Sequence, residues 1–313
     1  MTTSFRLAHV TDPHFRSFDG AHLGDFLGKR AVGALNLVVN RRRKHKMQLL
    51  AALADDLRSE KPDHLALTGD LSNVSIEPEW RAALSWVEGL GTPPADVTII
   101  PGNHDVYVPD VVARGTFERL FAPYQTRDVP DAPELQANAR PEVRAAASDG
   151  YPFVRLRGPA ALIAVNSCVA TGDLGAWGQV GDAQRARLEA ILTSPALAGR
   201  LRIVLIHHPP VKLKGGEDRN LRDRDALAAM LARAGADLVL HGHDHRDERA
   251  TLPGPGGRPI PIVGAGSASY SGGPETRSRF NVYELSEGAI TVVTRAHDEA
   301  TDTFREVRRE RLV

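Results

Sequence analysis

Five short polar clusters recur along the chain, and each directly follows an apolar run. They are TDPH at 11–14, TGDLSN at 68–73, PGNHD at 101–105, IHHPP at 206–210 and HGHDH at 241–245. The clusters combine histidines, aspartates and an asparagine, and none contains a cysteine. Imidazole, carboxylate and amide groups without a thiolate suit borderline divalent cations such as Mn²⁺, Fe²⁺, Zn²⁺ or Co²⁺. The clusters therefore indicate a metal site.

Each cluster alone has a simpler explanation, because Asp12 and Asp70 could cap a helix or turn and a lone histidine is usually a satisfied polar residue. Their recurrence at five strand ends favours one shared site, since the carboxyl ends of parallel strands meet at one edge of a sheet. In an extended segment, alternate residues point the same way, so a pair spaced by one residue could face one ion. The two such pairs are Asp12 with His14, and His243 with His245.

The candidate ligands outnumber those that one ion needs. This surplus predicts two ions that share a bridging carboxylate. Two ions roughly 3.5–4 Å apart can hold both the attacking and the leaving oxygen of an in-line displacement at phosphorus.

The apolar runs alternate with segments of helical period. Residues 5–11, 64–69 and 97–102 have the composition of buried strands, and residues 47–60 and 77–90 have the spacing of amphipathic helices. This order predicts parallel strands with right-handed crossovers.

The second half of the chain has a similar pattern with a different ending. Residues 125–150 lack periodicity and predict a long surface excursion, after which strand and helix signals alternate over 151–242. From about residue 247, strand signals with Gly/Pro turns predict antiparallel β-hairpins. We therefore expect residues 1–313 to form a single α/β domain, built as a two-sheet mixed β-sandwich flanked by helices.

Composition limits the possible partners and location. The chain of 313 residues has 39 Lys and Arg against 39 Asp and Glu, so its net charge gives no reason to expect a nucleic acid. The sole cysteine, Cys168, excludes an intrachain disulfide, and its apolar surroundings favour a buried structural thiol. The N-terminus has no secretory signal and no apolar run is long enough to span a membrane, so we expect a cytoplasmic protein.

Taken in order, the five clusters resemble the calcineurin-like metallophosphoesterase family. The resemblance extends from residue 12 to residue 245 and implies that family's four-layer fold. It implies a first metal ion bound by Asp12, His14, Asp70 and His245. It implies a second ion, bridged to the first by Asp70, whose ligands are Asp70, Asn103, His207 and His243.

The resemblance also implies a reaction, in which a hydroxide that bridges the two metal ions attacks phosphorus. His104 would stabilise the transition state or protonate the leaving oxygen, with Asp105 orienting it. The forms GNHD, HHPP and GHDH are most similar to the branch that contains cyclic-nucleotide and glycerophosphodiester phosphodiesterases. The expected activity is therefore that of a phosphodiesterase.

Contacts to the substrate are less closely defined by the motifs. His208 would lie beside the metal site, and Arg277 or Arg279 could reach a substrate phosphate from a loop of small residues that begins at Gly264. The same small residues could equally form a plain turn before the next strand.

A basic, amphipathic insertion at about 22–47 separates the first cluster from the first long helix. Between Lys29 and Lys46 it has seven basic residues and no acidic one. It could be a helical cap with a solvated basic end, or an interfacial element that contacts an anionic membrane or a lipid-linked phosphate. The second interpretation leaves open a lipid-linked pyrophosphate hydrolase, or a phosphomonoesterase, that acts at the membrane surface.

Nucleic acid binding and a purely non-catalytic role are both disfavoured. The basic run has no interleaved aromatic residues, which disfavours nucleic acid. A metal-stabilised interaction module without activity is disfavoured because no expected ligand is missing. The sequence leaves the oligomeric state open, and a homo-oligomer is compatible with it.

Overall fold

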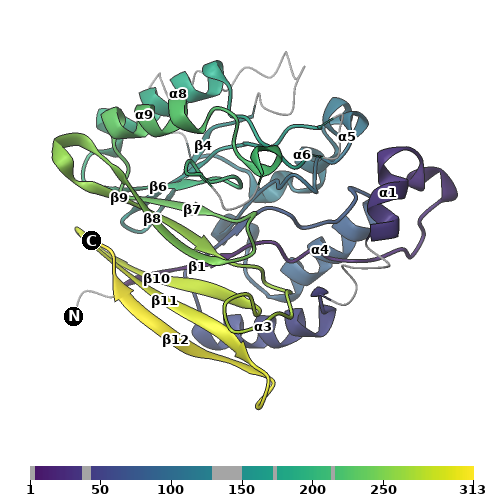
Figure 1. Ribbon diagram of the computed structural model, residues 1–313. Helices are drawn as coiled ribbons and strands as arrows, with labels where there is room; N and C mark the ends of the chain where they lie inside the picture. Colours follow the sequence, from purple (N-terminus) through teal and green to yellow (C-terminus); the bar gives the residue numbers. More distant parts are fainter. Residues whose placement is uncertain (1–3, 37–43, 129–149, 172–174, 213–215) are drawn as a thin grey trace.

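The computed structural model describes residues 4–36, 44–128, 150–171, 175–212 and 216–313. It has two six-stranded mixed sheets packed face to face, with helices on the outer face of each (Figure 1). This is the predicted α/β sandwich of four layers.

The first sheet has the strand order β12-β11-β10-β1-β2-β3. Its parallel part consists of β1 (Phe5–Val10), β2 (His64–Thr68) and β3 (Val97–Ile100). The connecting helices α3 (Met47–Glu60) and α4 (Glu77–Gly89) match the two helical segments predicted from periodicity. The predicted strand–helix order is therefore confirmed here.

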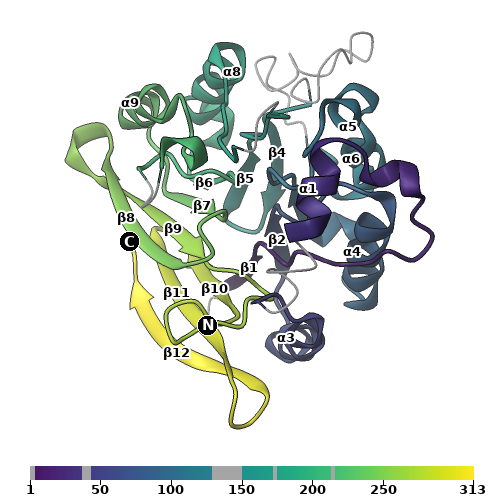
Figure 2. The same cartoon turned by 45° about the vertical axis from the view of Figure 1, so that its right-hand side comes forward.

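C-terminal hairpins widen the first sheet. Strands β10 (Arg279–Ser286), β11 (Ala289–Asp298) and β12 (Thr303–Arg311) pair antiparallel with one another, and β10 pairs antiparallel with β1. Figure 2 shows these strands on the same side of the molecule as α3.

The second sheet has the strand order β4-β5-β6-β7-β9-β8. Neighbours from β5 to β9 are parallel, while β4 and β8 are antiparallel edge strands. The strands are β4 (Phe153–Arg157), β5 (Ala160–Ala164), β6 (Leu201–Leu205), β7 (Leu238–His241), β8 (Asp247–Pro253) and β9 (Pro259–Ala265). Helices α8 (Asp182–Leu192) and α9 (Arg224–Ala234) cover its outer face (Figure 1).

Shorter helices lie in the connections. The α-helices are α1 (Lys29–Asn36), α5 (Pro109–Arg114) and α6 (Thr116–Leu120). Short 3₁₀ helices cover Leu23–Phe26, Pro94–Asp96, Ala122–Tyr124, Pro195–Leu197, Glu217–Arg219 and Pro255–Gly257. Most of the predicted surface excursion, residues 129–149, lies outside the described residues, and every helix in the described part is too short or too polar to cross a bilayer.

Buried apolar side chains form three clusters, one in each gap between the four layers. Strand β1 contributes to two of them, because Leu7 faces the second sheet while Ala8 and Val10 face α3 and α4. A strand buried on both faces has a continuous apolar sequence, which is why these segments lack clear alternation.

The strand directions bring the polar clusters together. The loops after β1, β2 and β3 meet the loops after β6 and β7 at one edge of the sandwich. Hydrogen bonds tie the two sheets at this edge, since His207 Nδ1 lies 2.8 Å from the Thr68 carbonyl oxygen and His243 N donates to Asp12 Oδ2 at 3.0 Å.

Candidate metal centre

One group of four ligand atoms lies where β1, β2 and the β7 loop meet. Asp12, His14, Asp70 and His245 each offer one ligand atom, and these atoms lie within 4.8 Å of one another. The Nε2 atom of His14 is 3.0 Å from Nε2 of His245 and 3.7 Å from Asp70 Oδ2. These are the four residues that the family resemblance assigns to the first ion.

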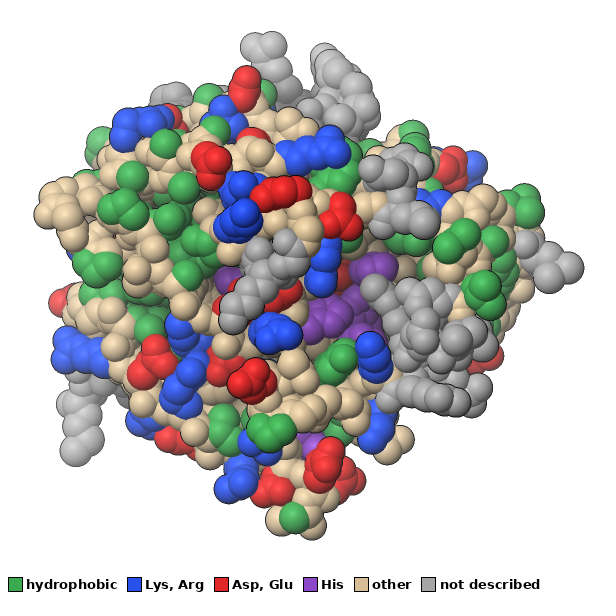
Figure 3. Space-filling view, in the orientation of Figure 1, with side chains coloured by type: hydrophobic (Ala, Val, Ile, Leu, Met, Phe, Trp, Pro, Cys, Tyr) green, Lys and Arg blue, Asp and Glu red, His purple; other side chains and the backbone are tan. Residues whose placement is uncertain are grey.

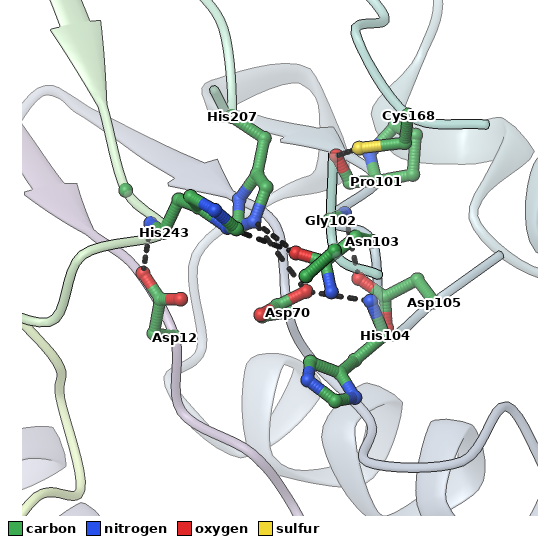
Figure 4. Close-up of polar contacts among 12 residues, drawn as sticks. Asp12, Asp70, Pro101, Gly102, Asn103, His104, Asp105, Cys168, His207 and His243 are labelled. Carbon is green, nitrogen blue, oxygen red and sulfur yellow. Dashed lines mark hydrogen bonds and ion pairs between the residues drawn. The ribbon is translucent and has the colours of Figure 1, made fainter. Parts of the chain in front are cut away.

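A second group adjoins the first on the other side of Asp70 (Figure 4). Asp70 Oδ1 lies 3.5 Å from Nε2 of His207. Asn103 Oδ1 lies 3.1 Å from the same Nε2 and 2.9 Å from Nδ1 of His243. Because the two oxygens of Asp70 face different groups, Asp70 has the position that a bridging carboxylate needs.

The hydrogen bonds behind the second group determine which nitrogens carry protons. His207 Nδ1 faces the Thr68 carbonyl oxygen at 2.8 Å, and His243 Nε2 faces the Arg219 carbonyl oxygen at 2.8 Å. A carbonyl oxygen only accepts, so these nitrogens carry the hydrogens. Burial lowers the pKa of His207 and, further, that of His243, which keeps both rings neutral. Both remaining nitrogens therefore direct lone pairs at Asn103 Oδ1.

The first group has the same arrangement. His14 Nδ1 lies 3.2 Å from the Ser72 carbonyl oxygen, so its other nitrogen faces His245 with a lone pair. Asp12 Oδ1 is buried and lies 3.1 Å from Nε2 of His245, while Oδ2 accepts from Thr11. Burial alone would raise the pKa of Asp12, but His245 beside it lowers the pKa below its usual value. Lone pairs that converge in a buried site fit a cation, and this donor set fits two divalent ions.

The backbone adopts a costly conformation at these residues. Non-glycine residues with left-handed φ cost of order 1–3 kcal/mol each and persist where the surroundings hold them. Five of the eight such residues in the described chain are proposed ligands, with φ of 52° at Asp12, 47° at His14, 53° at Asp70, 75° at His243 and 56° at His245.

Extended alternation would allow His243 and His245 to face one ion, whereas the family resemblance assigns them to different ions. In the structure, His245 lies in the first group and His243 lies against Asn103 of the second. The backbone is left-handed, not extended, at both residues.

Two glycines allow the loops after β2 and β3 to touch. A Cβ atom at Gly102 would lie 2.1 Å from the Asp70 nitrogen, and one at Gly69 would lie 2.4 Å from the Gly102 nitrogen. Gly69 also has a φ of 92°. The glycines of the GD and GNHD motifs therefore let the bridging carboxylate approach Asn103 closely.

His104 and Asp105 have different surroundings from those expected. The His104 ring is held by Asn73, whose carbonyl oxygen lies 2.6 Å from Nδ1. No hydrogen bond joins this ring to Asp105 among the described residues. Burial raises the pKa of Asp105, although donors surround its carboxylate. Asp105 organises the loops instead, because it accepts from the backbone nitrogens of Leu71, Ser72 and Gly102 and from Ser72 Oγ.

A cavity of about 480 Å³ opens over both groups. Figure 3 shows the histidines gathered in this hollow, with basic and acidic side chains around it. Its charged lining residues are Lys44, Asp70, Arg219, Asp244 and Arg246, and its histidines are His45, His104, His243 and His245. Cations beside a metal site suit an anionic substrate.

The three predicted substrate contacts do not line this cavity. His208 is fully buried against His243, with Nδ1 2.9 Å from Ser167 Oγ, and burial lowers its pKa well below the usual value. Arg279 is buried and lies 3.2 Å from Asp247. Arg277 lines a neighbouring cavity of about 240 Å³.

Three other residues near the site are Cys168, which the sequence analysis singled out, and Asn73 and His45, which it did not. Cys168 is buried, donates to the Pro101 carbonyl oxygen at 3.2 Å and has a pKa that burial raises well above its usual value, as expected of a structural thiol. The sequence analysis missed Asn73, although it stands inside the TGDLSN cluster. It also missed His45, whose place in the basic insertion gave no metal-ligand spacing.

Residues 5–247 match the sequence profile of the calcineurin-like phosphoesterases. The chain belongs to the calcineurin-like phosphoesterase family. With its two groups of His and Asp ligands, this family member is a metal-dependent phosphoesterase with a site for two metal ions. Among curated proteins, none matches the sequence.

Solved structures share this fold at low sequence identity. A dimetal phosphatase from Danio rerio is 12% identical, with 97% of this chain and 99% of that chain covered and a TM-score of 0.64. The purple acid phosphatase PPD1 from yellow lupin is 14% identical, with 98% and 53% covered and a TM-score of 0.59. GAP50, the anchor in the inner membrane complex of Plasmodium, is 14% identical, with 99% and 89% covered and a TM-score of 0.52.

The approach of the two loops predicts the effect of a single methyl group. Gly102→Ala should lower stability by about 2 kcal/mol or more and abolish most metal binding, because the added Cβ displaces Asp70. Gly89→Ala is the matched control, since a Cβ there meets no atom within 4 Å. Metal content after reconstitution with Mn²⁺ and the thermal midpoint are the measurements. Wild-type metal content in Gly102→Ala would contradict this account of the loops.

Proposed function

We propose that this phosphoesterase hydrolyses phosphodiesters at a dinuclear metal centre. The observation that carries the proposal is the pair of ligand groups that share Asp70 beneath a cavity of about 480 Å³. The first ion would be held by Asp12, His14, Asp70 and His245. The second would be held by Asp70, Asn103, His207 and His243.

The ligands fit Mn²⁺, Fe²⁺ or Zn²⁺, because imidazole and carboxylate groups bind all three. When bound, such a pair of ions lowers the pKa of water toward neutrality and neutralises charge on the phosphoryl oxygens. The protein fixes the ligands for this task, since carbonyl oxygens hold the rings of His14, His207 and His243 from behind.

His104 is the proposed proton donor. It lines the cavity without belonging to either ligand group, and its ring centroid lies 5.2 Å from that of His14. The Asn73 carbonyl oxygen holds the proton on Nδ1, so exchange with the reacting groups would occur at Nε2. When the P–O bond breaks, the leaving oxygen would take its proton from Nε2 of the His104 imidazolium, which leaves the neutral ring with its proton on Nδ1.

The cavity supports a diester over a monoester. A diester has a substituent on each side of phosphorus and a single negative charge, so it needs room in two directions and little positive charge. The cavity of about 480 Å³ is larger than a phosphoryl group alone, and Asp244 offsets part of the positive charge of Arg219 and Arg246, each 3.8 Å from its carboxylate. The forms of the GNHD, HHPP and GHDH motifs point the same way.

Substrate preference tests this proposal. Metal-free protein reconstituted with Mn²⁺ should turn over bis-p-nitrophenyl phosphate faster than p-nitrophenyl phosphate, because a cavity of about 480 Å³ would leave room for a second ester group. The two substrates release the same chromophore, so their kcat/KM values compare directly. A preference for the monoester would contradict the proposal, and cyclic nucleotides and glycerophosphodiesters would be the next substrates if the diester is preferred.

The role of His104 has its own signature. His104→Ala should keep its bound metal and lose about 10²- to 10⁴-fold in turnover, the usual contribution of a general acid. The loss should be smaller for a nitrophenolate leaving group than for an alkoxide, because nitrophenolate departs without a proton. Turnover of His104→Ala close to that of wild type would exclude the proton-donor role. An equal loss on a nitrophenyl ester and on an alkyl ester would exclude it too.

A second candidate uses the same centre on a lipid-linked phosphate at the membrane surface. The observation in its favour is an exposed apolar surface around α1, where Leu27, Val32 and Leu35 are 74%, 51% and 66% exposed. Two basic residues of the insertion make hydrogen bonds within the protein instead of pointing freely to a membrane. Lys29 donates to the Thr171 carbonyl oxygen at 2.9 Å, and Arg30 donates to the Ser75 carbonyl oxygen at 2.7 Å. Residues 41–43 lie outside the described chain.

Vesicle binding separates the two candidates. The second candidate predicts that the protein co-sediments with anionic phosphatidylglycerol vesicles, and that Leu27→Ser/Leu35→Ser and Arg41→Ala/Arg42→Ala/Arg43→Ala variants remain in the supernatant. Val307→Ser removes a side chain that is 41% exposed on β12 and serves as the control. Wild-type protein that stays in the supernatant would leave only the first candidate.

A further inference from the structure

The end of the insertion brings one histidine to the metal centre. His45 precedes α3 by two positions, outside all five motif clusters, yet it is buried with 4% of its surface exposed. It also lines the cavity over the two ligand groups. A buried imidazole at the wall of a metal site needs a partner that compensates its loss of water.

Residues 269–271 hold His45 in place through hydrogen bonds to the backbone around it and to its ring. The Lys46 nitrogen donates to the Ser269 carbonyl at 3.0 Å, and the Ser271 nitrogen donates to the Lys44 carbonyl at 2.6 Å. His45 thus forms an isolated antiparallel bridge with Tyr270. Its Nδ1 lies 2.8 Å from Ser269 Oγ, which restrains the ring itself.

This fixed ring lies against the first ligand group. Its centroid is 4.5 Å from that of His14 and 5.3 Å from that of His245, in edge-to-face contact with both. One ring nitrogen of each of the three histidines lies within 4.8 Å of the other two. Tyr270 packs 5.2 Å from His45 and closes this side of the group. Three imidazoles this close, next to two carboxylates, have the composition of a metal site.

We propose that His45 is a further ligand of the first metal ion. The inference deepens the proposed dinuclear centre and rests on it. The first ion would then have three imidazoles and two carboxylates, against two imidazoles, one amide and one carboxylate for the second. The difference makes the two positions unequal, and it favours at the first position the metals that prefer imidazole nitrogen. It also gives the insertion a role in the centre, independent of any membrane contact.

Metal titration tests the inference without a substrate. Metal-free wild type, His45→Ala and the control His22→Ala would be titrated with Mn²⁺ by electron paramagnetic resonance and with Co²⁺ by visible absorption. His22 is exposed in the same insertion. His45→Ala should bind one ion at least about tenfold more weakly, with the other unchanged and the Co²⁺ spectrum altered. His22→Ala should behave as wild type.

A milder variant guards against loss of folding. Ser269→Ala keeps the imidazole and removes only the hydroxyl beside Nδ1, so it should weaken binding of the same ion by a smaller factor. Thermal midpoints of the metal-free proteins would confirm that each variant folds. Wild-type metal affinity and an unchanged Co²⁺ spectrum in both His45→Ala and Ser269→Ala would overturn the inference. A raised KM in His45→Ala with metal binding intact would also overturn it, because His45 would then be a substrate contact. Wild type that binds fewer than two ions would instead overturn the dinuclear proposal itself.

Discussion

The whole centre depends on one constraint, which is that groups with lone pairs face one another inside the protein. Asn103 Oδ1 lies 3.1 Å from the unprotonated nitrogen of His207 and 2.9 Å from that of His243. Asp70 Oδ1 lies 3.5 Å from the same nitrogen of His207. Without a cation, the lone pairs of these atoms repel one another. The fold therefore holds an arrangement that becomes favourable when positive charge is bound between the groups.

Several features of the sandwich act together to hold this arrangement. The carboxyl ends of parallel strands in both sheets meet at one edge, and hydrogen bonds to backbone carbonyls orient the rings of His14, His207 and His243. Asp105 gathers backbone donors from two loops. The surrounding layers offset the cost of five left-handed residues, which is of order 1–3 kcal/mol each.

Much of this could be predicted from the sequence because it follows local rules. The period of residues 47–60 predicts α3, and the polar clusters after the strands predict where ligands converge. The remainder depends on tertiary contacts that leave no local pattern. His45 is positioned by Ser269, which is 224 residues away, and Asp105 binds backbone nitrogens, which every residue has. The left-handed turns at His243 and His245 break the alternation that an extended segment would have.

The central claim is that two ions lie on opposite sides of Asp70, and anomalous diffraction tests it most directly. Crystals of the protein soaked in Mn²⁺ would be measured at the manganese absorption edge. The account predicts two anomalous peaks roughly 3.5–4 Å apart, one among Asp12, His14 and His245 and the other among Asn103, His207 and His243. A single peak, or peaks away from Asp70, would contradict it.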